Sequence, residues 1–117
     1  MSLYQITSLN ELPPGARKLV TVAGKAIGVF NVNGQIVAVQ NICPHELAPI
    51  CVGRVDGTTL ESQPGQMIWG RDGEILACPW HGWEFDLLTG QCLTDRRRLR
   101  QFEVKIVDET IFIAVYS

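Results

Sequence analysis

The chain of 117 residues is predicted to fold as an all-β protein, with an antiparallel β base and a loop-rich subdomain inserted into it. Hairpin signals near both ends predict the base. No apolar pattern of helical period extends over ten or more residues. The middle of the chain is rich in glycine and proline and holds all four cysteines and both histidines. We therefore expect one domain over 1–117, with the base at 1–40 and 94–117 and the insert at about 41–93.

The N-terminal part of the base is expected to contain a short helical turn and three strands. Ser8–Glu11 carries a weak helix-capping signal, and Pro13, Pro14 and Gly15 close the turn. Asn33-Gly34 is a strong hairpin signal, because both residue types accept a positive φ. The strands, which are rich in β-branched residues, are expected over Lys18–Ala23, Ala26–Val32 and Gln35–Gln40.

The insert and the C-terminal part are expected to contain short strands and one more hairpin. In the insert, strands are expected over Met67–Gly70, Glu74–Cys78 and Trp83–Leu87, followed by a turn at Thr89-Gly90. In the base, strands are expected over Phe102–Val107 and Thr110–Val115, with Asp108-Glu109 between them.

The composition excludes several classes of function. Ten Lys and Arg residues against twelve Asp and Glu residues give a net charge of −2, which argues against a general nucleic-acid binder and against an anionic membrane partner. The first residues lack a secretory pattern, and no apolar stretch is long enough to cross a bilayer. We expect a cytoplasmic protein, in which cysteines stay reduced unless they bind metal or do redox chemistry.

Two close Cys/His pairs are the strongest chemical signal. They are Cys43-Pro44-His45 and Cys78-Pro79-Trp80-His81, and they use the only two histidines of the chain. Neither segment has helical spacing, so two loops would have to bring the ligands to one centre. Thiolate ligands suit iron-sulfur clusters and zinc, and imidazole suits iron and zinc. The residues therefore predict a metal centre and leave open which metal it holds.

These segments resemble the Rieske iron-sulfur family. The first match covers Cys43–Pro49, and the second covers Ala77–Gly90, with the sequence ACPWHGWEFDLLTG. The resemblance implies a Rieske-type fold with one 2Fe-2S cluster in the inserted subdomain.

The resemblance also implies which residue binds which iron. Cys43 and Cys78 would bind the buried iron, and His45 and His81 would bind the outer iron near the surface.

The cluster loops differ from those of Rieske proteins in cytochrome bc-type complexes. In those members each loop carries an extra cysteine, and the two extra cysteines form a disulfide. Ser and Tyr hydroxyl groups also donate hydrogen bonds to the cluster. This chain has Ala48, Trp80, Trp83 and Phe85 at the matching positions. Hydrogen bonds to the cluster sulfurs raise the potential, so we expect a value near the low end of the Rieske range of about −150 to +300 mV.

The resemblance therefore implies a soluble Rieske ferredoxin that carries single electrons from a flavin-dependent NAD(P)H reductase to a terminal oxygenase. The chain is expected to be an electron-transfer component and not an enzyme by itself. It cannot be the oxygenase, because a mononuclear iron site needs further histidines. Two alternatives are a small Rieske subunit of a nitrite reductase-like enzyme and a structural Cys2His2 zinc module.

The segment 54–71 separates the two loops more widely than in shorter ferredoxins of the family. It is expected to form an added hairpin or flap with turns at Asp56-Gly57, Pro64-Gly65 and Asp72-Gly73. Either a tolerated surface insertion or a partner-specific docking surface would account for it.

Three further features have a structural and a functional interpretation. Cys51 and Cys92 are expected to be small buried hydrophobic residues. Trp83 is expected in the core, and Trp80 is expected to shield the cluster or to lie at a docking face. The basic run Arg96–Arg100 is expected to be a solvated strand edge, with a docking site for an acidic partner as the alternative.

The cofactor prediction can be tested on the purified protein. We expect a red-brown protein that contains iron and acid-labile sulfide, because thiolate- and sulfide-bound ferric iron absorbs visible light and zinc does not. Metal analysis and the absorption spectrum check this. A colourless protein with zinc and without iron or sulfide would contradict it.

Overall fold

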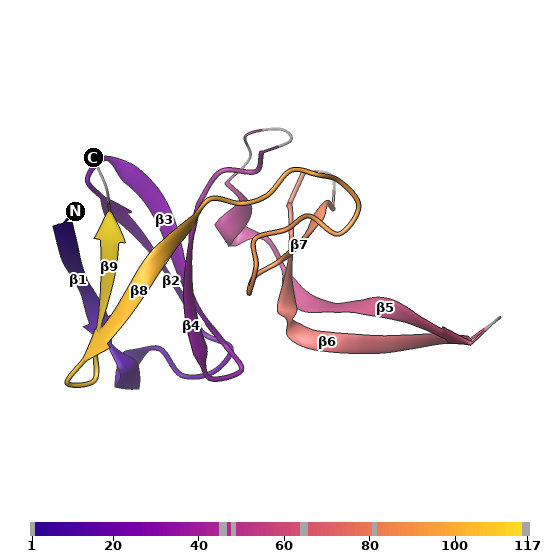
Figure 1. Cartoon of the computed structure of the whole chain (residues 1–117), viewed down its shortest axis with the longest axis horizontal. Coiled ribbons are helices and arrows are strands. Elements are labelled where there is room, and N and C mark those ends of the chain that lie inside the picture. The colour runs from indigo at the N-terminus through magenta and orange to yellow at the C-terminus, as the bar shows by residue number, and fades with distance from the viewer. Residues whose placement is uncertain (1, 45–46, 48, 64–65, 81, 116–117) are drawn as a thin grey trace.

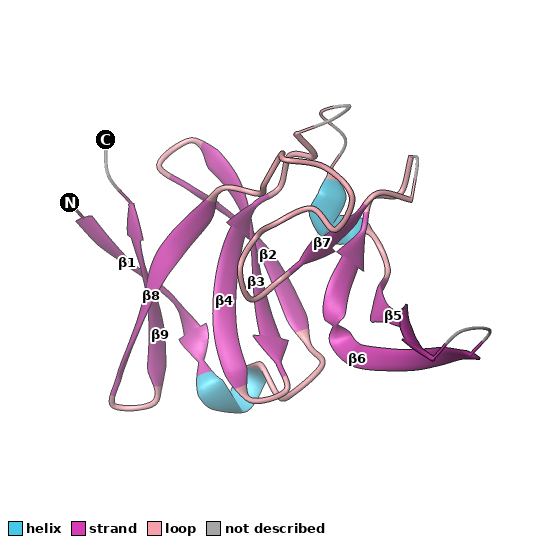
Figure 2. Cartoon of the chain, turned by 45° about the vertical axis from the view of Figure 1, so that its right-hand side comes forward, coloured by secondary structure: helices cyan, strands magenta, loops and turns pink. Residues whose placement is uncertain are grey.

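The computed structural model describes residues 2–44, 47, 49–63, 66–80 and 82–115. The expectation of an all-β protein is confirmed: nine strands and two short 3-10 turns make up its regular structure in this part of the chain. The strands form two antiparallel sheets (Figures 1 and 2). In the described residues, no helix is long and apolar enough to cross a membrane.

The larger sheet has six strands in the order β1-β9-β8-β4-β3-β2. It takes strands from both ends of the chain, because β8 pairs with β4 and β9 pairs with β1. Its strands are β1 (Ser2–Ser8), β2 (Arg17–Val22), β3 (Lys25–Val32), β4 (Gln35–Gln40), β8 (Gln101–Val107) and β9 (Thr110–Val115).

Both expected hairpins of this sheet are confirmed. Asn33 and Gly34 join β3 to β4 with φ of 51° and 102°, so both adopt the positive φ that this turn needs. The amide of Gly34 donates to Oδ1 of Asn31 at 2.7 Å, which closes the turn. Asp108 and Glu109 join β8 to β9, also with positive φ.

The first strand and the first turn differ from expectation. β1 was not expected, because most of its residues are exposed and its hydrophobic alternation is weak. Its pairing with β9 along nearly its whole length supplies the order that the local sequence does not. The expected helical turn is the 3-10 turn η1 (Leu9–Glu11). The capping expectation is wrong, since the side chain of Ser8 makes no cap hydrogen bond.

The smaller sheet has the order β5-β6-β7 and includes a long hairpin, so the expectation that the insert holds only short strands is wrong. Its strands are β5 (Val55–Gln63), β6 (Gln66–Ala77) and β7 (Glu84–Asp86). The β5–β6 hairpin projects from the body of the molecule (Figure 1). It confirms that the 54–71 segment forms part of a hairpin.

Two of the three turns expected in this hairpin are wrong. Asp56-Gly57 and Asp72-Gly73 lie inside strands, where the register is irregular: Asp56 pairs with Ile75, and Thr58 pairs with Gly70. Gly73 has a φ of +81°, so these turn-forming residues produce a bulge and not a reversal. Pro64-Gly65 lies outside the described residues, between Gln63 and Gln66, which pair with each other.

Two apolar clusters form the core. The base cluster lies within the larger sheet and includes Ile27, Val29, Ile111 and Ile113. The joining cluster connects β3 and β4 with the insert and contains Phe30, Val32, Val37, Val39, Cys43, Ile50, Cys51, Leu76, Cys78, Phe85, Leu87, Cys92 and Leu99. All four cysteines belong to the joining cluster, so the candidate metal centre lies where insert and base meet.

Candidate metal centre

The first loop begins three residues after β4 ends. Cys43 is fully buried, with 0% of its surface exposed. Its carbonyl accepts a hydrogen bond of 2.7 Å from the amide of Leu47, which has a φ of 59°. This bond closes a single turn from Cys43 to Leu47.

The second loop begins directly after β6 and is built in the same way. Cys78 is 2% exposed, and its carbonyl accepts a hydrogen bond of 2.9 Å from the amide of Gly82, which has a φ of 70°. The amide of Cys78 donates to the carbonyl of Trp83 at 2.8 Å, which fixes the start of the turn. Each loop therefore has a buried cysteine, a proline after it and a residue of positive φ four positions on.

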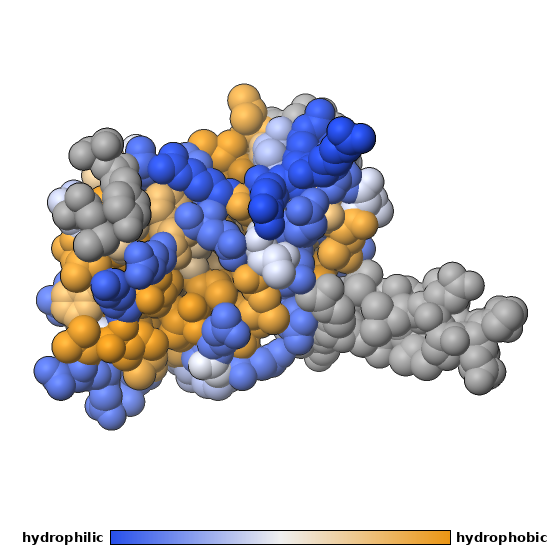
Figure 3. All heavy atoms as spheres, in the orientation of Figure 1, coloured by the Kyte–Doolittle hydropathy of each residue, from blue (hydrophilic) through white to orange (hydrophobic). Residues whose placement is uncertain are grey.

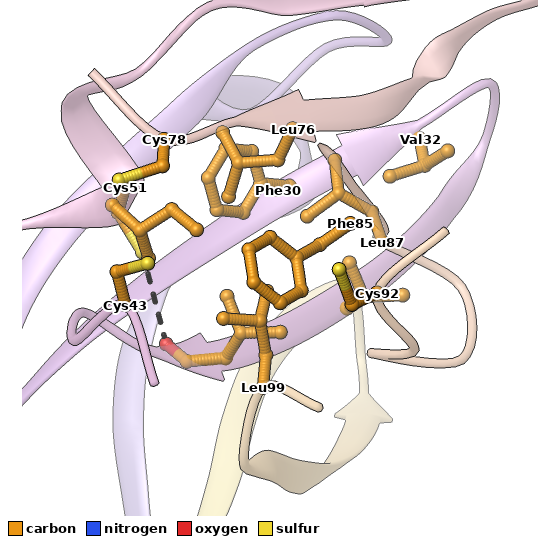
Figure 4. Packing of buried hydrophobic residues seen from close by; sticks show 13 residues of the cluster. Phe30, Val32, Cys43, Cys51, Leu76, Cys78, Phe85, Leu87, Cys92 and Leu99 are labelled. Atoms are coloured by element: carbon orange, nitrogen blue, oxygen red, sulfur yellow. Dashed lines mark hydrogen bonds between the residues drawn. The ribbon is translucent and has the colours of Figure 1, made fainter. Parts of the chain in front are cut away.

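Two of the four predicted ligands, His45 and His81, lie outside the described residues. In the sequence, His45 stands between Cys43 and Leu47, and His81 stands between Cys78 and Gly82. The structure brings Cys43 and Cys78 into the same apolar cluster, although they are 35 positions apart in the chain. Figure 4 shows Cys43, Cys51 and Cys78 grouped on one side of this cluster, with Cys92 on the other side beyond Phe85.

The loops lead from a buried end to an exposed end. Leu47 is 74% exposed and Trp80 is 58% exposed, whereas the two cysteines are buried. A group bound between the loops would thus have one side shielded from water and one side near the surface. Trp80 is exposed, and its expected role at a docking face stays a prediction.

Close backbone packing holds the two loops together. η2 (Ile50–Val52) follows the first loop, and the next residue, Gly53, lies against the residue before Cys78. A Cβ on Gly53 would lie 1.9 Å from the carbonyl oxygen of Ala77, so only glycine fits. The amide of Ala77 also donates to the carbonyl of Arg54 at 2.9 Å.

Arg17 joins the base to this packed segment. Its guanidinium donates to the carbonyls of Cys51 and Gly53 at 2.8 and 2.5 Å. The same group lies 5.5 Å from the centre of the Phe30 ring. Sequence reasoning missed Arg17 and Gly53, since one arginine in a strand and one glycine in a loop carry no specific signal.

Cys51 is buried, as expected, and is held from two sides. Its amide donates to Oδ1 of Asn41 at 2.7 Å, and its side chain lies against Gly28, where an added Cβ would be 2.4 Å from the Sγ atom. Burial raises the pKa of the Cys51 thiol to about 12, although the Gly28 backbone and the Arg17 charge act in the opposite direction. The thiol is therefore protonated at neutral pH and behaves as a small apolar group.

Cys92 is also buried, and all four cysteines are free of disulfides. The Sγ atom of Cys92 lies 3.9 Å from the Thr94 hydroxyl. Trp83 is partly buried and packs against the joining cluster, in agreement with its expected place in the core.

Comparison with known proteins identifies the family. The model of the Rieske [2Fe-2S] domain matches residues 2–108 of this chain. This chain belongs to the Rieske family. It therefore holds a Rieske-type 2Fe-2S cluster, and the buried cysteines on paired loops fit such a group, because they supply two thiolates in an apolar surrounding.

Similar proteins extend over nearly the whole chain. The ferredoxin component of the naphthalene 1,2-dioxygenase system of Pseudomonas aeruginosa is 30% identical over 108 residues, 91% of this chain and 88% of that protein. A chain in the complex of reduced oxygenase and oxidised ferredoxin of carbazole 1,9a-dioxygenase superposes with a TM-score of 0.76 at 23% identity, covering 96% of this chain and 92% of that one. A putative small subunit of an NADPH nitrite reductase superposes with a TM-score of 0.68 at 22% identity, covering 98% and 100%.

Alanine substitution of each cysteine separates the ligands from the other buried thiols. We expect Cys43→Ala and Cys78→Ala to abolish bound iron, sulfide and visible absorption, because each removes a thiolate. Cys51→Ala and Cys92→Ala are matched controls that keep the cluster. Loss of iron in Cys51→Ala with retention in Cys43→Ala would refute this assignment.

The raised pKa of Cys51 predicts a dependence of stability on alkaline pH. The unfolded thiol, with its ordinary pKa of 9.0, releases its proton before the folded thiol does, at about 12. This contribution to stability is complete below pH 9 and is lost as the pH rises toward 12. The melting temperature of the wild type should therefore fall more steeply over this range than that of Cys51→Ala. Parallel curves would contradict it.

Proposed function

We propose that this Rieske protein is a ferredoxin that delivers single electrons to a partner oxygenase. The observation that carries the proposal is the pair of equivalent loops that lead from buried cysteines to an exposed surface. Relatives that align over about nine tenths of the chain are ferredoxin components of dioxygenase systems, which supports this role. Both histidines are assigned to the cluster, so none remains for an oxygen-activating iron site.

The proposed ligands are Cys43 and Cys78 for the inner iron and His45 and His81 for the outer iron. The bound cluster supplies reversible one-electron chemistry. The described parts of the two loops support this arrangement, since the cysteines are buried while Leu47 and Trp80 are exposed. The apolar residues of the joining cluster shield the cysteine side from water, and the exposed side chains of Leu47 and Trp80 are available to a docking protein.

The residues after the second loop are proposed to keep the potential low. Trp83 and Phe85 carry no hydroxyl group with which to donate to the cluster sulfurs. Fewer donors stabilise the reduced state less, because its added negative charge stays uncompensated. A low potential suits a carrier that receives electrons from a flavin.

The electron donor is proposed to be a flavin-dependent NAD(P)H reductase, and the site of action is proposed to be the cytoplasm. The alternative, a small subunit of a nitrite reductase-like enzyme, rests on similarity of fold. The sequence relatives favour the ferredoxin role, because a ferredoxin component is 30% identical over most of its own length.

Redox titration and purification behaviour test the role of carrier. We expect the purified chain to take up one electron in an anaerobic titration with dithionite. We also expect NADH to reduce it through the reductase of a naphthalene dioxygenase system, and the oxygenase of that system to reoxidise it when substrate is present. A chain that takes up no electron, or that purifies only in a fixed ratio with a larger subunit, would overturn the proposal.

Replacing an outer ligand tests the assignment of histidine. His81→Cys should lower the midpoint potential by about 100 mV or more, because a thiolate adds negative charge to the oxidised and reduced cluster alike. Spectroelectrochemistry of the wild type and the variant measures the change. An unchanged potential in a variant that retains its iron would contradict the assignment of His81.

A further inference from the structure

The segment 87–101 concentrates positive charge in an acidic protein. It contains Arg96, Arg97, Arg98 and Arg100 and a single acid, Asp95, which gives it a net charge of +3. The rest of the chain has six basic and eleven acidic residues, a net charge of −5. Contrary to the expectation of a strand edge, most of Arg96–Arg100 lies in a loop before β8. We call these four arginines the basic patch.

A buried side chain and several hydrogen bonds fix the loop that carries the basic patch. Leu99 is buried in the joining cluster, and its amide donates to the carbonyl of Gly90 at 2.7 Å. The amide of Cys92 donates to the carbonyl of Arg97 at 3.0 Å, and the amide of Arg97 donates to Oδ1 of Asp95 at 2.9 Å. These anchors fix the loop while all four arginines remain exposed.

The basic patch lies beside the second cluster loop. The Arg97 guanidinium is 5.6 Å from the centre of the Trp83 ring, and the carbonyl of Trp83 accepts the amide hydrogen of Cys78. In Figure 3, strongly hydrophilic side chains gather where Figure 1 draws the loop between β7 and β8. Positive charge is thus presented next to the surface through which electrons would pass.

Among the residues that the structure describes, ion pairing accounts for only part of this charge. Nη1 of Arg97 lies 3.4 Å from Oδ2 of Asp95, and that pair is partly exposed and weak. Exposed like charges that are held close together repel one another. They attract an opposite charge and orient it, which raises the rate of productive encounter.

We propose that the basic patch docks an acidic surface of the protein that supplies the electron. This inference rests on the proposed function as an electron carrier. One-electron reduction makes the cluster more negative by one charge, so an acidic partner binds the oxidised form more tightly than the reduced form. An acidic donor protein therefore binds the oxidised carrier and releases the carrier once it is reduced. An acidic acceptor protein would instead bind the carrier most tightly after oxidising it, and this slow release would slow turnover.

The attraction of the basic patch for negative charge can be tested without a partner protein, by comparing how fast two flavins with the same ring system reduce the cluster. Reduced FMN and reduced riboflavin carry the same isoalloxazine, and only FMN carries a phosphate. One flavin hydroquinone reduces two oxidised protein molecules by one electron each, becomes oxidised flavin and releases two protons. Anaerobic stopped flow then gives the ratio of the FMN rate to the riboflavin rate.

At low salt we expect this ratio to exceed one by severalfold, up to about tenfold, and to approach one at high salt. The double variant Arg96→Gln/Arg98→Gln should bring the low-salt ratio close to one and leave the riboflavin rate nearly unchanged. Lys105→Gln, which removes an exposed charge from β8 in the base, is the control and should keep most of the wild-type effect. The absorption spectrum shows that each variant retains its cluster.

A wild-type ratio of one at low salt, or an equal fall in Lys105→Gln, would overturn the proposed patch. A protein without an iron-sulfur spectrum, or one that neither flavin nor dithionite reduces, would instead refute the proposed function. Retention on a carboxylate resin tests the assignment to the donor. The oxidised protein should elute at higher salt than the reduced protein, and the difference should shrink in the double variant. Equal or reversed elution would contradict docking of the donor.

Discussion

The contact between Gly53 and the carbonyl oxygen of Ala77 is the constraint on which the geometry of the site depends. It brings the end of the first loop segment against the residue before Cys78, at a distance that a methyl group would prevent. Arg17 reinforces the contact from the base, because it binds the carbonyls of Cys51 and Gly53. The separation of the two cysteines is thus set by backbone packing at the border of insert and base, and not by the cluster loops alone.

The surroundings of the site change from apolar at this border to polar at the protein surface. The joining cluster surrounds the cysteine ends of the loops with apolar side chains, while Leu47, Trp80 and the basic patch are exposed. A low-dielectric interior opposes added charge, and a wet, positively charged rim favours it. One small domain therefore combines a shielded redox group with a surface that distinguishes its partners by charge.

The parts of the fold and site that follow from local chemistry could be predicted from sequence. Asn33-Gly34 specifies a hairpin by its tolerance of positive φ, and two Cys/His pairs with proline are too specific to arise by chance. β1 could not be found in this way, because its order comes from pairing with β9. Turns were wrongly predicted at Asp56-Gly57 and Asp72-Gly73, because a β-bulge and a chain-reversing turn use the same residue types. The roles of Gly53 and Arg17 arise only in three dimensions.

The burial of Cys43 and Cys78 also limits how the protein can be made. The two residues are 0% and 2% exposed, so we expect insertion of iron and sulfide to require an opening of the surrounding chain. We expect the inorganic group to be delivered while the insert is still open, because metal binding and folding are coupled in such sites. Loss of the cluster should likewise require the insert to open, which makes the lifetime of the prosthetic group a measure of how often this subdomain unfolds locally.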